Sequence, residues 1–148
     1  MDTTEALNDE NGIPRGADKK EAFHLEREKM VKPFSFRRPD NIPLDHKAFV
    51  RLGGTDNINC NVQILNEGGD NNMHYHPNMD SVFYVMKGKI KVYGPGDEVI
   101  GDFAPNEGCV MPSGARYWFA VSSEEEAWLL HVTSYPKGRK YAKRITLE

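Results

Sequence analysis

The sequence predicts an all-β fold, an antiparallel sandwich or barrel, for most of the chain. From Lys47 onward, runs of strand length follow one another and are separated by glycine, proline and asparagine. No stretch between them is long enough for the helical crossovers that parallel strands require. Many short strands at regular spacing are typical of antiparallel all-β domains. The chain has 148 residues, 39% of them hydrophobic, which is the size of one such domain.

The expected strands are apolar and β-branched runs bounded by turn residues. The sequence Gly94-Pro95-Gly96-Asp97 is a tight hairpin signal and divides two of these runs. In chain order the strands are expected at Lys47–Leu52, Ile58–Leu65, Ser81–Met86, Lys89–Tyr93, Glu98–Ile100, Cys109–Met111, Tyr117–Val121 and Ala127–Thr133.

The two ends of the chain differ from this central region. Residues 1–32 are polar and predict a flexible arm, in which Ala17–Met30 is rich in helix formers but has few apolar positions. Prolines then break the chain into an extended lead-in to the predicted barrel, residues 33–136. Residues 137–148 predict a basic tail that is solvated or packed on a partner subunit, and an anion site in its run from Lys137 to Arg144 is the less favoured alternative.

Composition excludes several classes of function. The formal net charge of −3 gives no basic excess for binding nucleic acid. No apolar run approaches the roughly 20 residues that span a bilayer, and the acidic, polar N-terminus is unlike a secretory signal. The isolated residues Cys60 and Cys109 predict two buried free thiols, as in a cytoplasmic protein, although a disulfide between them stays open.

The chemistry concentrates in one stretch, MHYHPNMDSVFYVMKG, from Met73 to Gly88. Side chains alternate between faces along a strand, so His74 and His76 are expected to point the same way. Two imidazoles on one face are a natural pair of metal ligands. A surface pair or a structural pair of histidines would have the same spacing.

The stretch resembles the first motif of the cupins. That motif is a glycine, five residues, HxH, three or four residues, a glutamate, six residues and a glycine, and here Gly68 and Gly88 frame the histidine pair. The second cupin motif, Gly followed by Pro-x-Gly and a histidine, resembles Gly108 and the run Pro112-Ser113-Gly114-Ala115-Arg116-Tyr117. The resemblance covers about Lys47 to Tyr135. It implies a cupin double-stranded β-helix, a jelly-roll barrel that often encloses a ligand, and a homodimer.

This sequence departs from the metal set that the resemblance implies. Cupin metals are usually held by the two histidines, the glutamate and the histidine of the second motif. Counting forward from His76 puts Asp80 in the glutamate position, whereas counting back from Gly88 puts Ser81 there. Alternation allows only one of these two to face inward unless a bulge intervenes. The position of the third histidine is occupied by Tyr117.

Three functions remain open at this point. In the first, His74, His76 and Asp80 hold a divalent metal, with Fe(II) expected first and Mn, Zn or Ni as alternatives, in an oxygenase or lyase. In the second, a histidine acts as general base and Tyr117 as acid in a metal-independent dehydratase, cyclase or isomerase. In the third, the barrel only binds a small molecule or is a structural module without a site. No organic cofactor is expected.

Five further residues are candidates for the site. His131, on the last expected strand, either lines the cavity or is structural, and Arg116 either clamps a carboxylate or lies at the rim. Gln63 and Asn61 share one strand face and would orient a substrate if that face is the inner one. Trp118 is either a substrate contact or a core or dimer contact.

Overall fold

The computed structural model describes residues 7–42, 47–66, 71–135 and 144–147. These residues divide into two units, Met1–Pro33 and Phe34–Glu148. The first unit contains helix α2 (Ala17–Glu28), which has no buried residue. The helix expected within the N-terminal arm therefore forms, but it contributes no core. No helix in the described part of the chain is long and apolar enough to cross a membrane.

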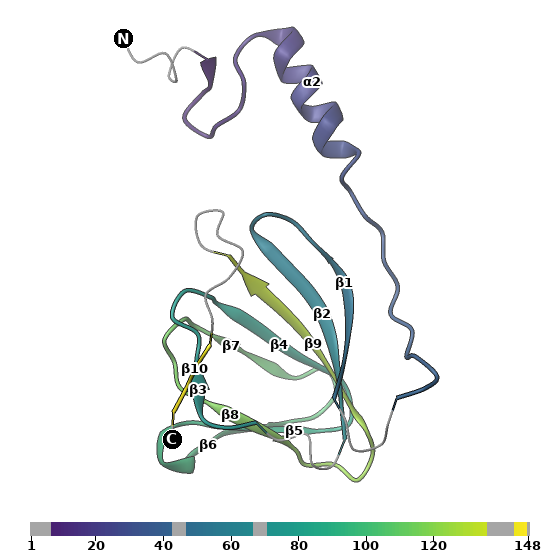
Figure 1. Ribbon diagram of the computed structural model, residues 1–148, viewed down its shortest axis with the longest axis vertical. Coiled ribbons are helices and arrows are strands. Elements are labelled where there is room, and N and C mark those ends of the chain that lie inside the picture. Colours follow the sequence, from purple (N-terminus) through teal and green to yellow (C-terminus); the bar gives the residue numbers. More distant parts are fainter. Residues whose placement is uncertain (1–6, 43–46, 67–70, 136–143, 148) are drawn as a thin grey trace. The chain divides into compact units, whose positions relative to one another are not determined.

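The second unit is built from antiparallel strands (Figure 1). In chain order they are β1 (Ala48–Gly54), β2 (Ile58–Leu65), β3 (His74–Tyr75), β4 (Ser81–Lys87), β5 (Ile90–Tyr93), β6 (Val99–Phe103), β7 (Gly108–Met111), β8 (Trp118–Val121), β9 (Ala127–Ser134) and β10 (Ile145–Thr146), with a 3₁₀ turn at Pro95–Asp97 between β5 and β6. All eight strands expected from the sequence are present, with ends that differ by at most three residues.

The strands form two sheets that face each other (Figure 1). One sheet has the order β1-β2-β9-β4-β7, and the other contains β6-β5-β8. The pair β10-β3 extends the second sheet, because the backbone of His74 exchanges two hydrogen bonds with that of Tyr117, with N–O distances of 3.0 and 2.9 Å. This arrangement confirms the all-β fold with antiparallel sheets.

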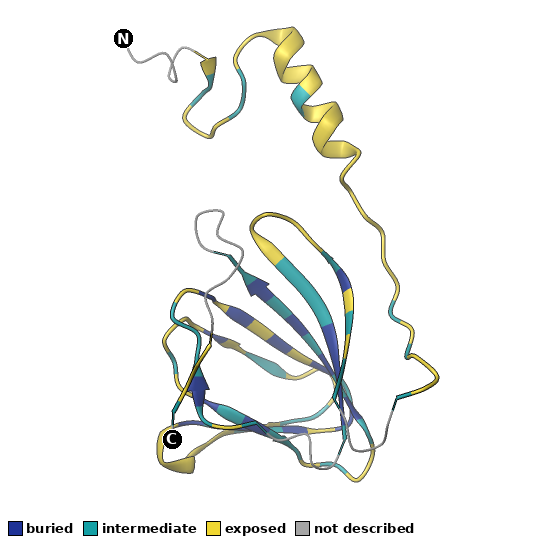
Figure 2. Ribbon diagram, in the orientation of Figure 1, coloured by how far each residue is buried: buried dark blue, intermediate teal, exposed yellow. Residues whose placement is uncertain are grey.

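The core lies between the two sheets and follows from strand alternation. In β4 the buried side chains are Ser81, Phe83 and Val85, at every second position. Strand β9 has the same pattern from Ala127 onward, and Figure 2 shows the buried segments along the facing strands. The inner face of the five-stranded sheet therefore supplies both apolar packing and the polar residues Ser81 and His131.

The outer face of the five-stranded sheet carries a second apolar cluster, centred on Leu52, Val62 and Ile64. The extended segment 34–42 covers part of it. The ring of Phe36 packs edge-on against Trp128, with centroids 5.1 Å apart, and the Arg38 guanidinium donates to the Glu126 carboxylate at 2.7 and 2.8 Å. Segment 34–42 therefore packs against the outer face of the five-stranded sheet.

The end of the chain corrects one expectation. Residues 137–148 are expected to form a basic tail, yet β10 pairs with β3 in the register Ile145–Tyr75 and Thr146–His74. The last described residues are therefore part of the second sheet. The basic residues Lys137, Arg139, Lys140 and Lys143 lie outside the described residues, as does Gly68 of the first motif. Cys60 and Cys109 are free thiols, and both are half-buried.

Candidate functional site

A cavity of about 150 Å³ opens between the two sheets. Strands of both sheets contribute to its walls, so it lies inside the barrel. The described residues that line it are Lys47, Phe49, Gln63, Asn71, His74, His76, Phe83, Tyr117, Phe119, His131 and Arg144.

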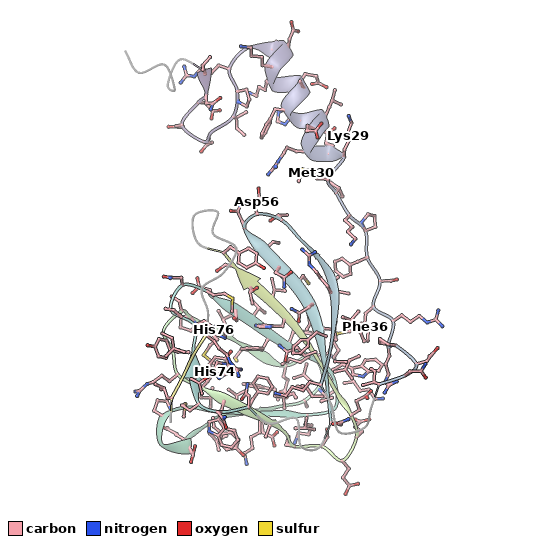
Figure 3. All side chains as sticks on the ribbon, in the orientation of Figure 1. Lys29, Met30, Phe36, Asp56, His74 and His76 are labelled. Carbon is pink, nitrogen blue, oxygen red and sulfur yellow. The ribbon has the colours of Figure 1, made fainter. Side chains whose placement is uncertain are left out.

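Strand β3 places the two histidines of the first motif in this cavity. Figure 3 labels both His74 and His76 in this part of the barrel, and their ring centroids lie 5.2 Å apart. His74 Nδ1 donates to the Asn72 carbonyl oxygen at 2.7 Å, which leaves Nε2 as the nitrogen with a lone pair. Burial lowers the pKa of His74, and burial together with the neighbouring His74 lowers that of His76 to about 4. Both rings are therefore neutral near pH 7.

Tyr117 packs against the histidine pair from the start of β8. Its ring centroid lies 4.4 Å from that of His74 and 6.3 Å from that of His76. The residue is 2% exposed, and burial raises the pKa of its hydroxyl well above the ordinary value. Tyr117 is therefore a neutral phenol near pH 7 and supplies a hydrogen-bond donor beside two imidazoles.

His131 occupies the other side of the cavity. Its ring stacks on Phe83 with centroids 4.5 Å apart, and Gln63 Nε2 donates to its Nδ1 at 3.0 Å. Because Nδ1 accepts, the proton of the neutral ring is on Nε2. Burial, with smaller effects of His76 and His74, lowers the pKa of His131 to about 4. His131 therefore presents an N–H group, whereas His74 presents a lone pair.

Several buried polar atoms on the inner side of the barrel have no hydrogen-bond partner among the described residues. They include His131 Nε2, His76 Nδ1 and Asn61 Oδ1. Asn61 lies opposite His131 in the β2–β9 register. Buried polar groups in native proteins are rarely unpaired unless a ligand or water satisfies them. Of these residues, His131 and His76 line the cavity, where a polar ligand or water would satisfy their unpaired nitrogen atoms.

The structure brings together five of the nine residues that the sequence singles out: His74, His76, Tyr117, His131 and Gln63 all line the cavity. Asn61 is half-buried and lies on the same strand face as Gln63, but it is not among the lining residues.

The other three predicted residues lie away from the cavity. Asp80 is exposed, and its carboxylate accepts from the Ser113 backbone N–H at 2.8 Å. Arg116 is exposed. Trp118 stacks on Tyr93 and donates to the Asp97 carboxylate, because alternation along β8 turns it away from the side of Tyr117 and Phe119. The roles predicted for Asp80, Arg116 and Trp118 do not agree with these placements.

The described residues do not fit a 2-His-1-carboxylate metal centre. Ser81 faces inward at the position of the family's glutamate, since burial alternates from Ser81 onward in β4, and a serine hydroxyl is a weak ligand. Tyr117 is neutral, which also makes it a poor ligand. No group of three histidine, cysteine, aspartate or glutamate residues within the described ranges is arranged to hold a metal ion.

Sequence reasoning missed two charged residues of the cavity, Lys47 and Arg144. Lys47 precedes the first strand, and its ammonium group lies 5.8 Å from the centroid of the Phe119 ring. Arg144 precedes β10. In the sequence Arg144 ends a basic run that begins at Lys137, and an anion site is one interpretation of that run. Nothing in the run places Arg144 beside the cavity, because a two-residue strand leaves no periodic pattern.

The fold and the cavity define a small cupin-domain protein. The family model for the cupin domain matches residues 61–133, which include both histidines of the first motif and Tyr117 of the second. This match confirms the resemblance stated from the two motifs. No curated protein matches the chain by sequence.

Solved structures agree on the fold. A conserved protein with a double-stranded β-helix domain from Klebsiella pneumoniae is 17% identical, with a TM-score of 0.65 over 82% of this chain and 95% of that one. KdgF from a Halomonas species is 20% identical, with a TM-score of 0.54 over 62% and 80%. The oxalate decarboxylase of Lactobacillus farciminis is 19% identical, with a TM-score of 0.54 over 74% of this chain and 33% of that one. At these identities the likeness shows the fold alone.

Proposed function

We propose that this cupin domain is an enzyme that transfers protons on a small organic molecule, as an isomerase, dehydratase or cyclase does, without a resident metal. One observation carries the proposal: a hydrogen-bond acceptor on His74 and donors on Tyr117 and His131 line one cavity. A base and an acid held in a fixed arrangement are the minimum that general acid–base catalysis requires.

The roles follow from the hydrogen bonds. His74 Nε2, whose lone pair is fixed by the bond from Nδ1 to Asn72, takes a proton from a carbon next to a carbonyl group. His131 Nε2–H donates to the carbonyl oxygen as negative charge develops there. The proton then returns to another carbon, or Tyr117 protonates a leaving hydroxyl group, which departs as water. In the isomerisation His74 is neutral again once the proton has returned to carbon. In the dehydration His74 passes the proton it took to the Tyr117 oxygen, and both residues return to their starting states.

Hydrogen–deuterium exchange tests this proposal. Small ketones and oxo acids are incubated with the protein in D₂O, and loss of their C–H signals is followed by NMR. We expect the wild type to catalyse exchange and His74→Gln to slow it by roughly 10²-fold or more. With a 3-hydroxy acid as the probe, Tyr117→Phe should slow the loss of water by a similar factor, because Tyr117 protonates the leaving hydroxyl group. The matched control is Tyr84→Phe, which removes a hydroxyl group that bonds Asn106 on the exposed surface. Equal rates in Tyr117→Phe and Tyr84→Phe would contradict the role of Tyr117.

The same samples also test the alternative predicted from the sequence, a metal-dependent oxygenase or lyase, against the metal-independent function proposed above. Metal content is measured in the purified wild type and in His76→Ala, and exchange is measured before and after treatment with a chelator. Proton transfer by side chains predicts that the chelator has no effect on the rate. A metal that His76→Ala loses, together with activity that the chelator removes, would favour the metal-dependent function.

A further inference from the structure

We infer that the cavity binds a small organic acid, with its carboxylate on Arg144 and a second oxygen on His131. This inference adds a substrate class to the proposed function, and its relevance to catalysis rests on that function. It names the substrate class, which neither the strand pattern nor the histidine pair indicates.

The charge of the cavity supports this class of ligand. Its described lining includes the exposed guanidinium group of Arg144 and no carboxylate. The three histidines add no charge near pH 7, since their pKa values are lowered by burial. A guanidinium group at the wall of a cavity whose described lining holds no carboxylate attracts an anion.

Strand β10 fixes Arg144 on the cavity side of the sheet. Because Ile145 pairs with Tyr75 and Thr146 with His74, the antiparallel register brings Arg144 opposite His76. Residues directly opposite each other in a pair of strands project to the same face. The Leu147 backbone N–H donates to the Met73 carbonyl oxygen at 2.8 Å, which extends the pairing beyond the strand. The positive charge of Arg144 also contributes to lowering the pKa of His74 and of His76.

The other end of the ligand is indicated by His131. This residue is 8% exposed, lines the cavity, and its Nε2–H has no partner within the described residues. A hydroxyl or oxo oxygen of the ligand would accept this hydrogen bond. The cavity volume of about 150 Å³ is comparable to that of cavities that hold a benzene-sized molecule, so a small organic acid fits. Phe83 and Phe119 would contact its carbon chain.

Three probes test the inference on the full chain: 2-hydroxybutanoate, its neutral amide, and butanoate. Binding is measured by NMR titration at low ionic strength. We expect the hydroxy acid to bind at least about tenfold more tightly than the amide, because only the acid pairs with the guanidinium group. We expect butanoate to bind less tightly than the hydroxy acid, because it lacks the oxygen that His131 donates to. Equal affinities for the acid and the amide would overturn the inference.

Charge variants locate the carboxylate. Arg144→Gln should weaken binding of the acid by about tenfold or more and leave binding of the amide unchanged, whereas Arg144→Lys should keep most of the affinity. The matched control is Lys91→Gln, which removes the same charge from β5 at a position between the buried residues Ile90 and Val92. An effect of Arg144→Gln no larger than that of Lys91→Gln would contradict the assignment.

A measurement on the wild type does not depend on the folding of any variant. Raising the salt concentration should weaken binding of the acid but not of the amide, and an equal effect on both would overturn the inference. The binding measurements can fail independently of the proton-exchange experiment that tests the proposed function. Preferential binding of the acid without proton exchange contradicts only the proposed function. Exchange on neutral ketones without preference for the acid contradicts only this inference.

Discussion

At the scale of single residues, the site depends on which nitrogen of each histidine carries its proton. The Asn72 carbonyl oxygen holds the proton of His74 on Nδ1, and the Gln63 amide holds that of His131 on Nε2. The two rings therefore present opposite hydrogen-bonding groups to the same cavity although both are neutral imidazoles. Gln63 acts here as a positioning residue, because it sets the tautomer of His131 from the neighbouring strand.

Burial of neutral histidines makes the stability of the barrel depend on pH. The pKa values of His76 and His131 are lowered from 6.5 to about 4, mainly by burial. Between these two pH values the unfolded chain binds protons that the folded chain does not, so the free energy of unfolding should fall as the pH falls from 6.5 towards 4. For His131 alone the loss is about 3 kcal/mol. Urea denaturation at intervals across this range measures it.

Two variants separate His131 from the other titrating groups. His131→Gln should show a smaller loss of stability between pH 6.5 and 4 than the wild type. The matched control is His24→Gln on helix α2, an exposed residue of the other unit, which should leave the pH dependence unchanged. An identical pH dependence in His131→Gln and in the wild type would show that His131 is not buried in its neutral form.

At the scale of elements, the close packing of β7 on β4 depends on a glycine of the second motif. Gly108 pairs with Tyr84, and a Cβ atom at Gly108 would overlap the backbone carbonyl oxygen of Phe83. Phe83 is the residue on which His131 stacks. A glycine is therefore required at this position because the backbones of β7 and β4 lie too close together for a side chain, and not because of its backbone dihedral angles.

Gly108→Ala should destabilise the barrel by about 3 kcal/mol, because β7 must move away from β4 to accommodate the methyl group. The matched control is Gly96→Ala in the turn after β5, where φ is +70° and no atom lies within 4 Å of the added Cβ. That change should cost only about 1 kcal/mol, through backbone strain alone. Equal losses of stability in the two variants, measured by urea denaturation, would contradict this account of the packing.

Strands with a clear alternating pattern are predictable from the sequence, and the short ones are not. The apolar runs of β4 and β9 mark the bounds of these strands, and His131 could be proposed for the site because it lies on a late strand of a cupin-like barrel. Strand β10 has two residues, so Arg144 could not be placed beside His76 before the pairing with β3 was known. Asp80 lies one residue before β4, where alternation does not yet fix the direction of a side chain.

At the scale of the whole molecule, the sequence motifs indicate the fold more reliably than the chemistry. The spacing of glycines, prolines and histidines reflects turns and strand ends, which the barrel requires whatever it binds. The residues that differ from the family pattern, Ser81 and Tyr117, change the chemistry without changing the fold, because both still pack inward. The homodimer and the cytoplasmic location expected from the sequence stay predictions.

The two units of the chain are expected to contribute very differently to stability. The first unit, through Pro33, contains a helix with no buried residue. Segment 34–42 belongs to the second unit, where Phe36 and Ile42 pack against the outer cluster and Arg38 pairs with Glu126. Apolar burial is the dominant stabilising contribution, at about 1.5–3 kcal/mol for a fully buried large side chain. Stability should therefore depend on the point at which the chain is truncated.

Deletion of residues 1–33 should leave the free energy of unfolding within about 0.5 kcal/mol of that of the full chain, since none of the described residues of this unit is buried. Deletion of residues 1–42 should lower it by about 3 kcal/mol or more, because Trp128 and the apolar cluster on the outer face become exposed. Phe36→Ala in the full chain should account for part of this loss. Urea denaturation monitored by tryptophan fluorescence measures all three variants, and an equal loss in the two deletions would show that the first unit packs on the barrel.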